Sequence, residues 1–129
     1  MRADLLALAA LFCCATPAAA DRFSLTYDGV GLGFVPLGGV GEIGVNCYLY
    51  GQNGRWAMVD LGLGFPDDRL PGVDIVLPDL RFIEEQRAFH DGLILTHAHE
   101  DHLGAVPYLW PRLGCPIWCT AFTAAVLLR

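Results

Sequence analysis

The run Thr96-His97-Ala98-His99-Glu100-Asp101-His102 decides the fold, because it gathers three of the chain's four histidines within six positions. The apolar segment 92–95 precedes it and is typical of a short buried strand, so the run begins where a strand ends. Side chains at the end of a strand can converge on a small cation, and zinc accepts imidazole and carboxylate ligands. The sequence therefore predicts a metal site in this run.

The spacing within the run suggests how the ligands divide. His97 and His99 are two residues apart, so both rings can point the same way on an extended or turning backbone and chelate one ion. Asp101 and His102 follow directly and are placed to serve a second ion nearby. The alternative, a polar loop whose histidines are satisfied within the protein, is disfavoured because histidine is scarce elsewhere in the chain.

At this point the sequence resembles a known family. His97-x-His99-x-Asp101-His102 is similar to the signature of the metallo-β-lactamase fold, and the flanking sequence narrows the resemblance to the β-CASP branch and the ribonuclease J family. The most specific feature is the loop Gly39-Val40-Gly41-Glu42-Ile43-Gly44 combined with the His-Glu-Asp-His sequence. The resembling stretches are 36–44, 46–51, 59–62 and 95–105.

The resemblance implies a fold and a chemistry. The fold would be α+β, the N-terminal portion of an αβ/βα sandwich. His97 and His99 would ligate one Zn²⁺, and Asp101 and His102 would ligate a second, with Mn²⁺ as an alternative metal. Asp101 and His102 would also be catalytic. Asp60 would orient the ligands through hydrogen bonds. The family acts on RNA by 5′-to-3′ exonuclease and endonuclease cleavage, so the resemblance also implies an RNA substrate, a homo-oligomer, no membrane partner and a cytoplasmic location.

The length of 129 residues fits one domain at most. Residues 21–129 are expected to be the N-terminal part of a metallo-β-lactamase domain. The family's third metal histidine, its bridging aspartate and its β-CASP domain would lie beyond Arg129, and residues 121–128 suggest an apolar helix without a stop signal. We therefore expect a fragment that is inactive by itself.

Residues 1–20 have two interpretations. The apolar run from Leu5 to Ala15, followed by Ala18-Ala19-Ala20, is typical of a secretory signal peptide and is too short for a membrane-spanning helix. Asp4 weakens the positive start of such a signal, so the alternative is a start codon assigned too far upstream. The family favours the second interpretation and the cytoplasm.

The net charge of −6, without a basic patch, argues against RNA binding by this segment alone. Two rival functions stay open. One is another hydrolase of the same fold, such as a β-lactamase, a lactonase or a thioesterase. The other is an inert truncated product.

Secondary structure is expected as strands followed by alternating strands and helices. Strands are expected at 34–37, 45–50, 55–60, 73–77, 93–96 and 116–118, with a hairpin loop at 51–54 and a longer loop at 62–72. Helices are expected at 78–89, in part of 103–113, and at 121–128. The loop 39–44 also matches the dinucleotide pattern G-x-G-x-x-G, but that pattern must open a helix and a strand is expected next.

Other residues have more modest interpretations. Glu42 is interpreted either as facing the metal cleft or as a solvated turn residue. His90 is expected on the surface, Glu100 points away from the ligands, and Trp110 and Trp118 are expected in the core. The cysteines Cys47, Cys115 and Cys119 are predicted to be core thiols rather than disulfides or a second zinc site.

Overall fold

A computed structural model of the chain describes residues 23–27, 30–67 and 70–129. These residues form one mixed six-stranded sheet whose strands lie side by side in chain order. The strands are β1 (Phe23–Tyr27), β2 (Val30–Gly38), β3 (Cys47–Gln52), β4 (Arg55–Val59), β5 (His90–Ile94) and β6 (Ile117–Trp118). The helices are α2 (Arg81–Glu85), the 3₁₀ helix η1 (Arg87–Phe89), α3 (Glu100–Leu103), α4 (Val106–Leu113) and α5 (Ala121–Leu127).

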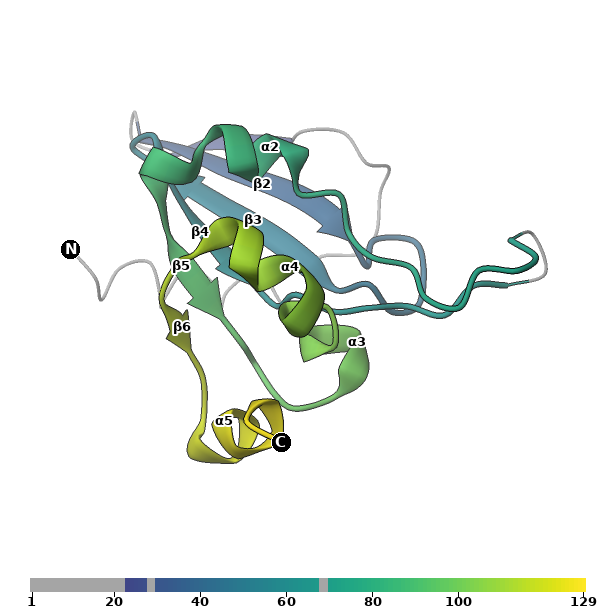
Figure 1. Cartoon of the computed structure of the whole chain (residues 1–129). Helices are drawn as coiled ribbons and strands as arrows, with labels where there is room; N and C mark the ends of the chain where they lie inside the picture. The colour runs from purple at the N-terminus through teal and green to yellow at the C-terminus, as the bar shows by residue number, and fades with distance from the viewer. Residues whose placement is uncertain (1–22, 28–29, 68–69) are drawn as a thin grey trace.

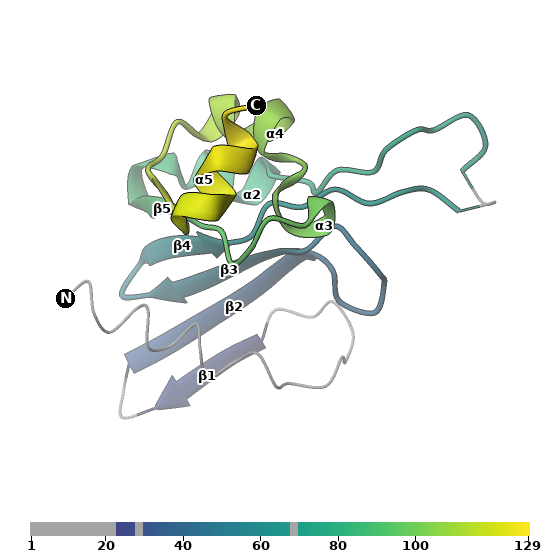
Figure 2. The same cartoon turned by 90° about the horizontal axis from the view of Figure 1, so that it is seen from below.

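The sheet has an antiparallel half and a parallel half. Strands β1 to β4 pair antiparallel, whereas β5 runs parallel to β4 and β6 runs parallel to β5. Figures 1 and 2 show α2, α4 and α5 on one side of this sheet. The layers confirm the predicted α+β fold.

The hairpin of β3 and β4 follows from its local sequence. Cys47 and Leu49 are buried, and they alternate with the half-buried Tyr48 and Tyr50, as expected for a strand with one face on a core. The turn is the pair 53–54, where Asn53 has φ 52° and Gly54 has φ 73°. Positive φ at both central residues defines the two-residue turn that matches strand twist, so the predicted hairpin is confirmed with a tighter loop.

The core lies between the sheet and the helices. The sheet contributes Leu49, Met58 and Leu93, and the helices contribute Ile83 and Leu109, all of them buried. Burying one such side chain is worth about 1.5–3 kcal/mol. This core fixes β4 beside β5, and the ends of these two strands carry the candidate site.

The connection between β4 and β5 is a long loop followed by short helices. Figure 1 shows the loop extending away from the sheet, and one antiparallel bridge between Gly64 and Val76 closes its base. The predicted strand at 73–77 is wrong, because only that bridge forms there. The predicted helix at 78–89 is split into α2 and η1. At the start of α2, the Asp79 carboxylate accepts from Arg81 N at 3.0 Å.

Three burial predictions are also wrong. His90 begins β5 beside Trp56 and is only 9% exposed, because the strand starts earlier than its apolar residues suggest. Trp110 is 37% exposed, although its indole N–H donates to the carbonyl of the buried Cys115 at 2.8 Å. Trp118 is 43% exposed, because β6 is the last strand of the described sheet.

The prediction of core thiols is confirmed for Cys47 and Cys115. Cys47 and Cys115 are buried and Cys119 is half-buried, and all three are free thiols. Burial raises the pKa of the Cys47 thiol, and the nearby Asp60 carboxylate raises it further. Burial also raises the pKa of the Cys115 thiol. The Cys47 and Cys115 thiols therefore stay protonated at neutral pH and behave as small apolar groups.

Candidate metal centre

The histidine-rich run follows β5 directly and turns into α3. Its backbone is tied to segments far away in the chain: Leu61 N donates to the His102 carbonyl at 2.8 Å, and Leu63 N donates to the Glu100 carbonyl at 3.1 Å. Asn46 N donates to the Asp101 carbonyl at 3.0 Å. These bonds hold the run against the segment after β4 and against the start of β3.

Gly62 allows this close approach. A Cβ atom built on Gly62 would lie 1.7 Å from the carbonyl oxygen of Asp101, well inside van der Waals contact. Glycine is therefore required here for packing against the metal run.

Asp60 is the buried centre of the hydrogen-bond network. It directly follows β4, adopts the left-handed region with φ 59° and is 3% exposed. Its carboxylate accepts from the Thr96 backbone N–H at 2.8 Å, from the Thr96 hydroxyl at 2.9 and 3.0 Å, and from His102 Nδ1 at 2.8 Å. The expectation that Asp60 orients ligands therefore has a geometric basis.

This network determines which ring nitrogens are free. His102 donates its Nδ1–H to Asp60, so its Nε2 carries the lone pair. The Thr96 hydroxyl gives its one hydrogen to Asp60, so it accepts from His97 Nδ1 at 2.9 Å and leaves Nε2 of His97 with a lone pair. Metal ligation needs such lone pairs.

The four predicted ligands lie together as two pairs of donors. His97 Nε2 is 3.2 Å from His99 Nδ1, and Asp101 Oδ2 is 3.4 Å from His102 Nε2. The His97 and His102 rings lie 4.0 Å apart between centroids, so the two pairs are neighbours. Two ligands of a tetrahedral zinc, each bound at about 2.0–2.2 Å, are separated by about 3.3–3.6 Å, so the separation within each pair is close to that needed for one ion.

The described part of the chain does not complete a three-ligand site for one ion. Within residues 23–27, 30–67 and 70–129, no three or more His, Cys, Asp or Glu side chains are grouped to hold one metal ion. The described residues thus provide two half-sites rather than one full site.

The remaining candidates take structural positions. Glu42 is exposed and its Oε1 accepts from Gly39 N at 3.2 Å, which favours the turn interpretation. Glu100 is exposed at the start of α3. The strand β3, not a helix, follows the glycine-rich loop, in agreement with the argument against dinucleotide binding.

Asn46 and Thr96 join this network without having been predicted to do so. Both belong to the stretches that carry the family resemblance, but their side chains act through contacts that only the fold creates. Thr96 connects Asp60 to His97, and Asn46 contacts Asp101 and His102 from 55 and 56 residues away in the sequence.

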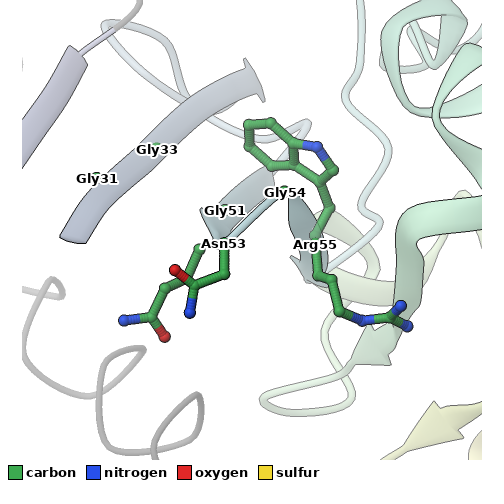
Figure 3. A pocket seen from close by; sticks show the side chains of 8 residues that line it. Gly31, Gly33, Gly51, Asn53, Gly54 and Arg55 are labelled. Atoms are coloured by element: carbon green, nitrogen blue, oxygen red, sulfur yellow. The ribbon is translucent and has the colours of Figure 1, made fainter.

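A cavity of about 140 Å³ lies elsewhere, around the turn between β3 and β4 (Figure 3). Gly33 and Gly51 leave room there for the indole of Trp56, because a Cβ on Gly51 would lie 2.6 Å from its ring. This turn is at the opposite end of β4 from Asp60, so the cavity is separate from the candidate metal centre.

Comparison with known proteins agrees with this geometry. Residues 40–128 match the Metallo-beta-lactamase superfamily. The chain is 54% identical over 98 residues to Ribonuclease J of Sinorhizobium meliloti, covering 73% of this chain and 17% of the relative. It is 45% identical over 98 residues to Ribonuclease J of Mycolicibacterium smegmatis, covering 75% and 18%. It is 41% identical over 93 residues to Ribonuclease J 2 of Staphylococcus aureus, covering 72% and 17%.

The chain thus spans about 17% of the length of the curated relatives it matches. The match includes Asp60 and the histidine-rich run, which contains both donor pairs. The chain therefore belongs to the Metallo-beta-lactamase superfamily, and the relatives that it matches there are ribonucleases J.

Proposed function

We propose that this chain supplies the metal-binding segment of a ribonuclease J-type nuclease that uses two zinc ions. The observation that supports this most directly is the pair of donor sets, with separations of 3.2 and 3.4 Å, in a sequence whose relatives are ribonucleases J. The superfamily implies metal ions; the choice of zinc rests on the imidazole-rich donor set, which Mn²⁺ also accepts.

Each residue has a role in this proposal. His97 and His99 would hold one ion, and Asp101 and His102 the other. Asp60 would accept the Nδ1–H of His102, which leaves Nε2 of His102 unprotonated for a metal ion. Through the Thr96 hydroxyl, it would leave Nε2 of His97 unprotonated in the same way. When bound, two such ions supply an activated water as nucleophile and stabilise negative charge on the phosphoryl oxygens.

The proposal extends to the whole protein. Each donor pair supplies two protein ligands, where a catalytic zinc takes about three. We therefore assign the activity to a protein of the relatives' length that acts on RNA as a cytoplasmic homo-oligomer. Among the described residues, no helix has the length and apolar character needed to cross a membrane.

A chimaera tests the function. The matched 98 residues of the Sinorhizobium meliloti Ribonuclease J are replaced by those of this chain, and the product is reconstituted with zinc or manganese. We expect cleavage of 5′-monophosphorylated single-stranded RNA, and loss of that cleavage after His97→Ala or Asp101→Ala. Turnover of a β-lactam, a lactone or a thioester with intact RNA would contradict the nuclease assignment. A folded chimaera without any of these activities would favour an inert segment.

The location has its own test. Residues 1–20 lie outside the described residues, and the cytoplasmic assignment predicts no processed chain that begins at Asp21. Mass spectrometry of cell fractions measures this directly. A chain beginning at Asp21 outside the cytoplasm would establish export instead.

A further inference from the structure

The side-chain amide of Asn46 lies between the two donor atoms of the second pair. Its Nδ2 is 3.0 Å from Asp101 Oδ2, 3.0 Å from the Asp101 carbonyl oxygen and 3.2 Å from His102 Nε2. The two side-chain atoms that it faces are those that would bind the second ion.

The orientation of this amide is fixed by its partners. The Asp101 carbonyl and carboxylate oxygens can only accept, so the NH₂ group must face them. On the other side, the Tyr48 hydroxyl lies 2.8 Å from Asn46 Oδ1 and 3.3 Å from the Gly39 carbonyl oxygen, and it can donate to either. The backbone of Asn46 is held as well, since its N–H donates to the Asp101 carbonyl and its carbonyl accepts from Gly62 N at 2.9 Å. Asn46 is therefore a rigid donor at a fixed distance from Asp101.

The two contacts respond differently to a bound ion. The unprotonated Nε2 of His102 has one lone pair, so it cannot face the amide and a metal ion together. An Asp101 carboxylate oxygen has more than one acceptor direction, so it can keep the Asn46 bond while it ligates. The amide thus releases His102 and continues to hold the Asp101 carboxylate.

We propose that Asn46 is a positioning residue that sets the metal affinity of the Asp101–His102 pair and leaves the His97–His99 pair unaffected. The inference rests on the proposed metal centre. Without Asn46, the half-exposed Asp101 side chain is free to rotate. Metal binding must then restrict this rotation, and the lost conformational entropy lowers the metal affinity. Loss of a hydrogen-bond partner that orients a ligand typically lowers metal affinity about 10- to 100-fold.

The test is a zinc titration of the 129-residue chain, followed through the imidazole ¹⁵N signals of each histidine. Asn46→Ala is expected to raise the Kd sensed at His102 by about 10- to 100-fold and to leave the Kd at His97 and His99 unchanged. Asn46→Leu, which keeps the side-chain size without hydrogen bonds, should show the same loss. Tyr48→Phe should show a smaller loss, and Gln86→Ala, in a distant turn, none.

Each outcome is decisive. Equal affinity at His102 in Asn46→Ala and the unmodified chain, or tighter binding in the variant, would overturn this inference and leave the metal centre standing. Equal weakening at all three histidines would also overturn it, because Asn46 would then act on the fold alone. No zinc response in the unmodified chain or in the chimaera would overturn the metal centre itself. If a variant chain does not fold, the same substitutions are compared in the chimaera by metal content against a chelator.

Discussion

At the scale of single residues, we infer that Asp60 sets the positions of two protons in the histidine-rich run. Its carboxylate accepts from His102 Nδ1 and from the Thr96 hydroxyl, so Nε2 is free on both His102 and His97. Asp60→Asn preserves the shape of the side chain, and asparagine tolerates the backbone φ of 59° at this position. It replaces one acceptor oxygen by an NH₂ donor, however, and a donor facing Nδ1 favours a proton on Nε2.

We therefore expect Asp60→Asn to move His102 from the Nδ1–H to the Nε2–H tautomer in the metal-free chain. The ¹⁵N chemical shifts of the imidazole report this directly. Thr96→Val is the matched comparison, because it removes the hydroxyl next to His97 and should leave His102 unchanged. An unaltered His102 tautomer in Asp60→Asn would show that Asp60 does not set it.

His90 gives a prediction about pH. Burial lowers the pKa of His90, while its bond to the Gly92 carbonyl and the charge of Asp91 oppose the change; its Nδ1 has no hydrogen-bond partner among the described residues. The unfolded chain, with a pKa of about 6.5 for histidine, therefore binds this proton more readily than the folded chain. The contribution of neutral His90 to stability is complete above about pH 6.5 and is lost as the pH falls toward the folded pKa.

The measurement is urea unfolding at several pH values between 8 and 5.5. As the pH falls through this window, the free energy of unfolding of the unmodified chain should decrease by up to about 1.4 kcal/mol per pH unit more than that of His90→Phe. The reason is that the variant has no imidazole to bind a proton at position 90. The other three histidines are the same in both proteins, so the difference isolates His90. Identical pH dependence in the two proteins would contradict the prediction.

At the scale of elements, the site depends on how closely the segment after β4 approaches the turn into α3. Gly62→Ala places a Cβ 1.7 Å from the Asp101 carbonyl oxygen, which Asn46 holds in place. We expect a loss of about 1–3 kcal/mol or more in the free energy of unfolding, together with weaker zinc binding at His102. Gly31→Ala is the control, because no described atom lies within 4 Å of its Cβ. Equal stability of the two variants would show that the run moves aside without cost.

The elements that could be predicted are those whose own side chains determine them. β3 and β4 follow from alternating burial and from the Asn53-Gly54 turn. Residues 73–77 have the composition of a strand, but a strand also needs a partner, and only Val76 has one. The burial of Trp118 could not be predicted for a similar reason. It depends on whether another element covers the short strand β6, and the apolar character of the indole does not determine that.

The site could be predicted only in part, for a related reason. His97, His99, Asp101 and His102 stand out because they are contiguous, and the structure brings them together in two pairs. The roles of Asn46 and Thr96 depend on hydrogen bonds across 55 and 36 residues of chain. Such contacts are created by the strand order, so their donors look like ordinary polar residues in the sequence.

At the scale of the whole molecule, the described chain shows several large apolar side chains at its surface. Ile43 is 100% exposed, Phe65 68%, Phe122 72% and Leu128 87%. Exposed apolar surface of this kind favours association, and a net charge of −6 opposes it only weakly in salt. Purification of the 129-residue chain is therefore expected to give self-association that increases with concentration, measured by light scattering. Phe122→Ser should reduce it.

The final prediction is that the 129-residue chain alone has no catalytic turnover on RNA. His97 and His99 form one donor pair and Asp101 and His102 the other, so each ion would have two protein ligands from this chain where a catalytic zinc needs about three. Weak binding of zinc at either donor pair is compatible with this arrangement, but a tightly held pair of ions is not. The measurement is metal stoichiometry after zinc reconstitution, alongside RNA cleavage, with His99→Ala as the control. Two tightly bound zinc ions per chain with multiple turnover, both lost in His99→Ala, would show that two donors per ion are enough.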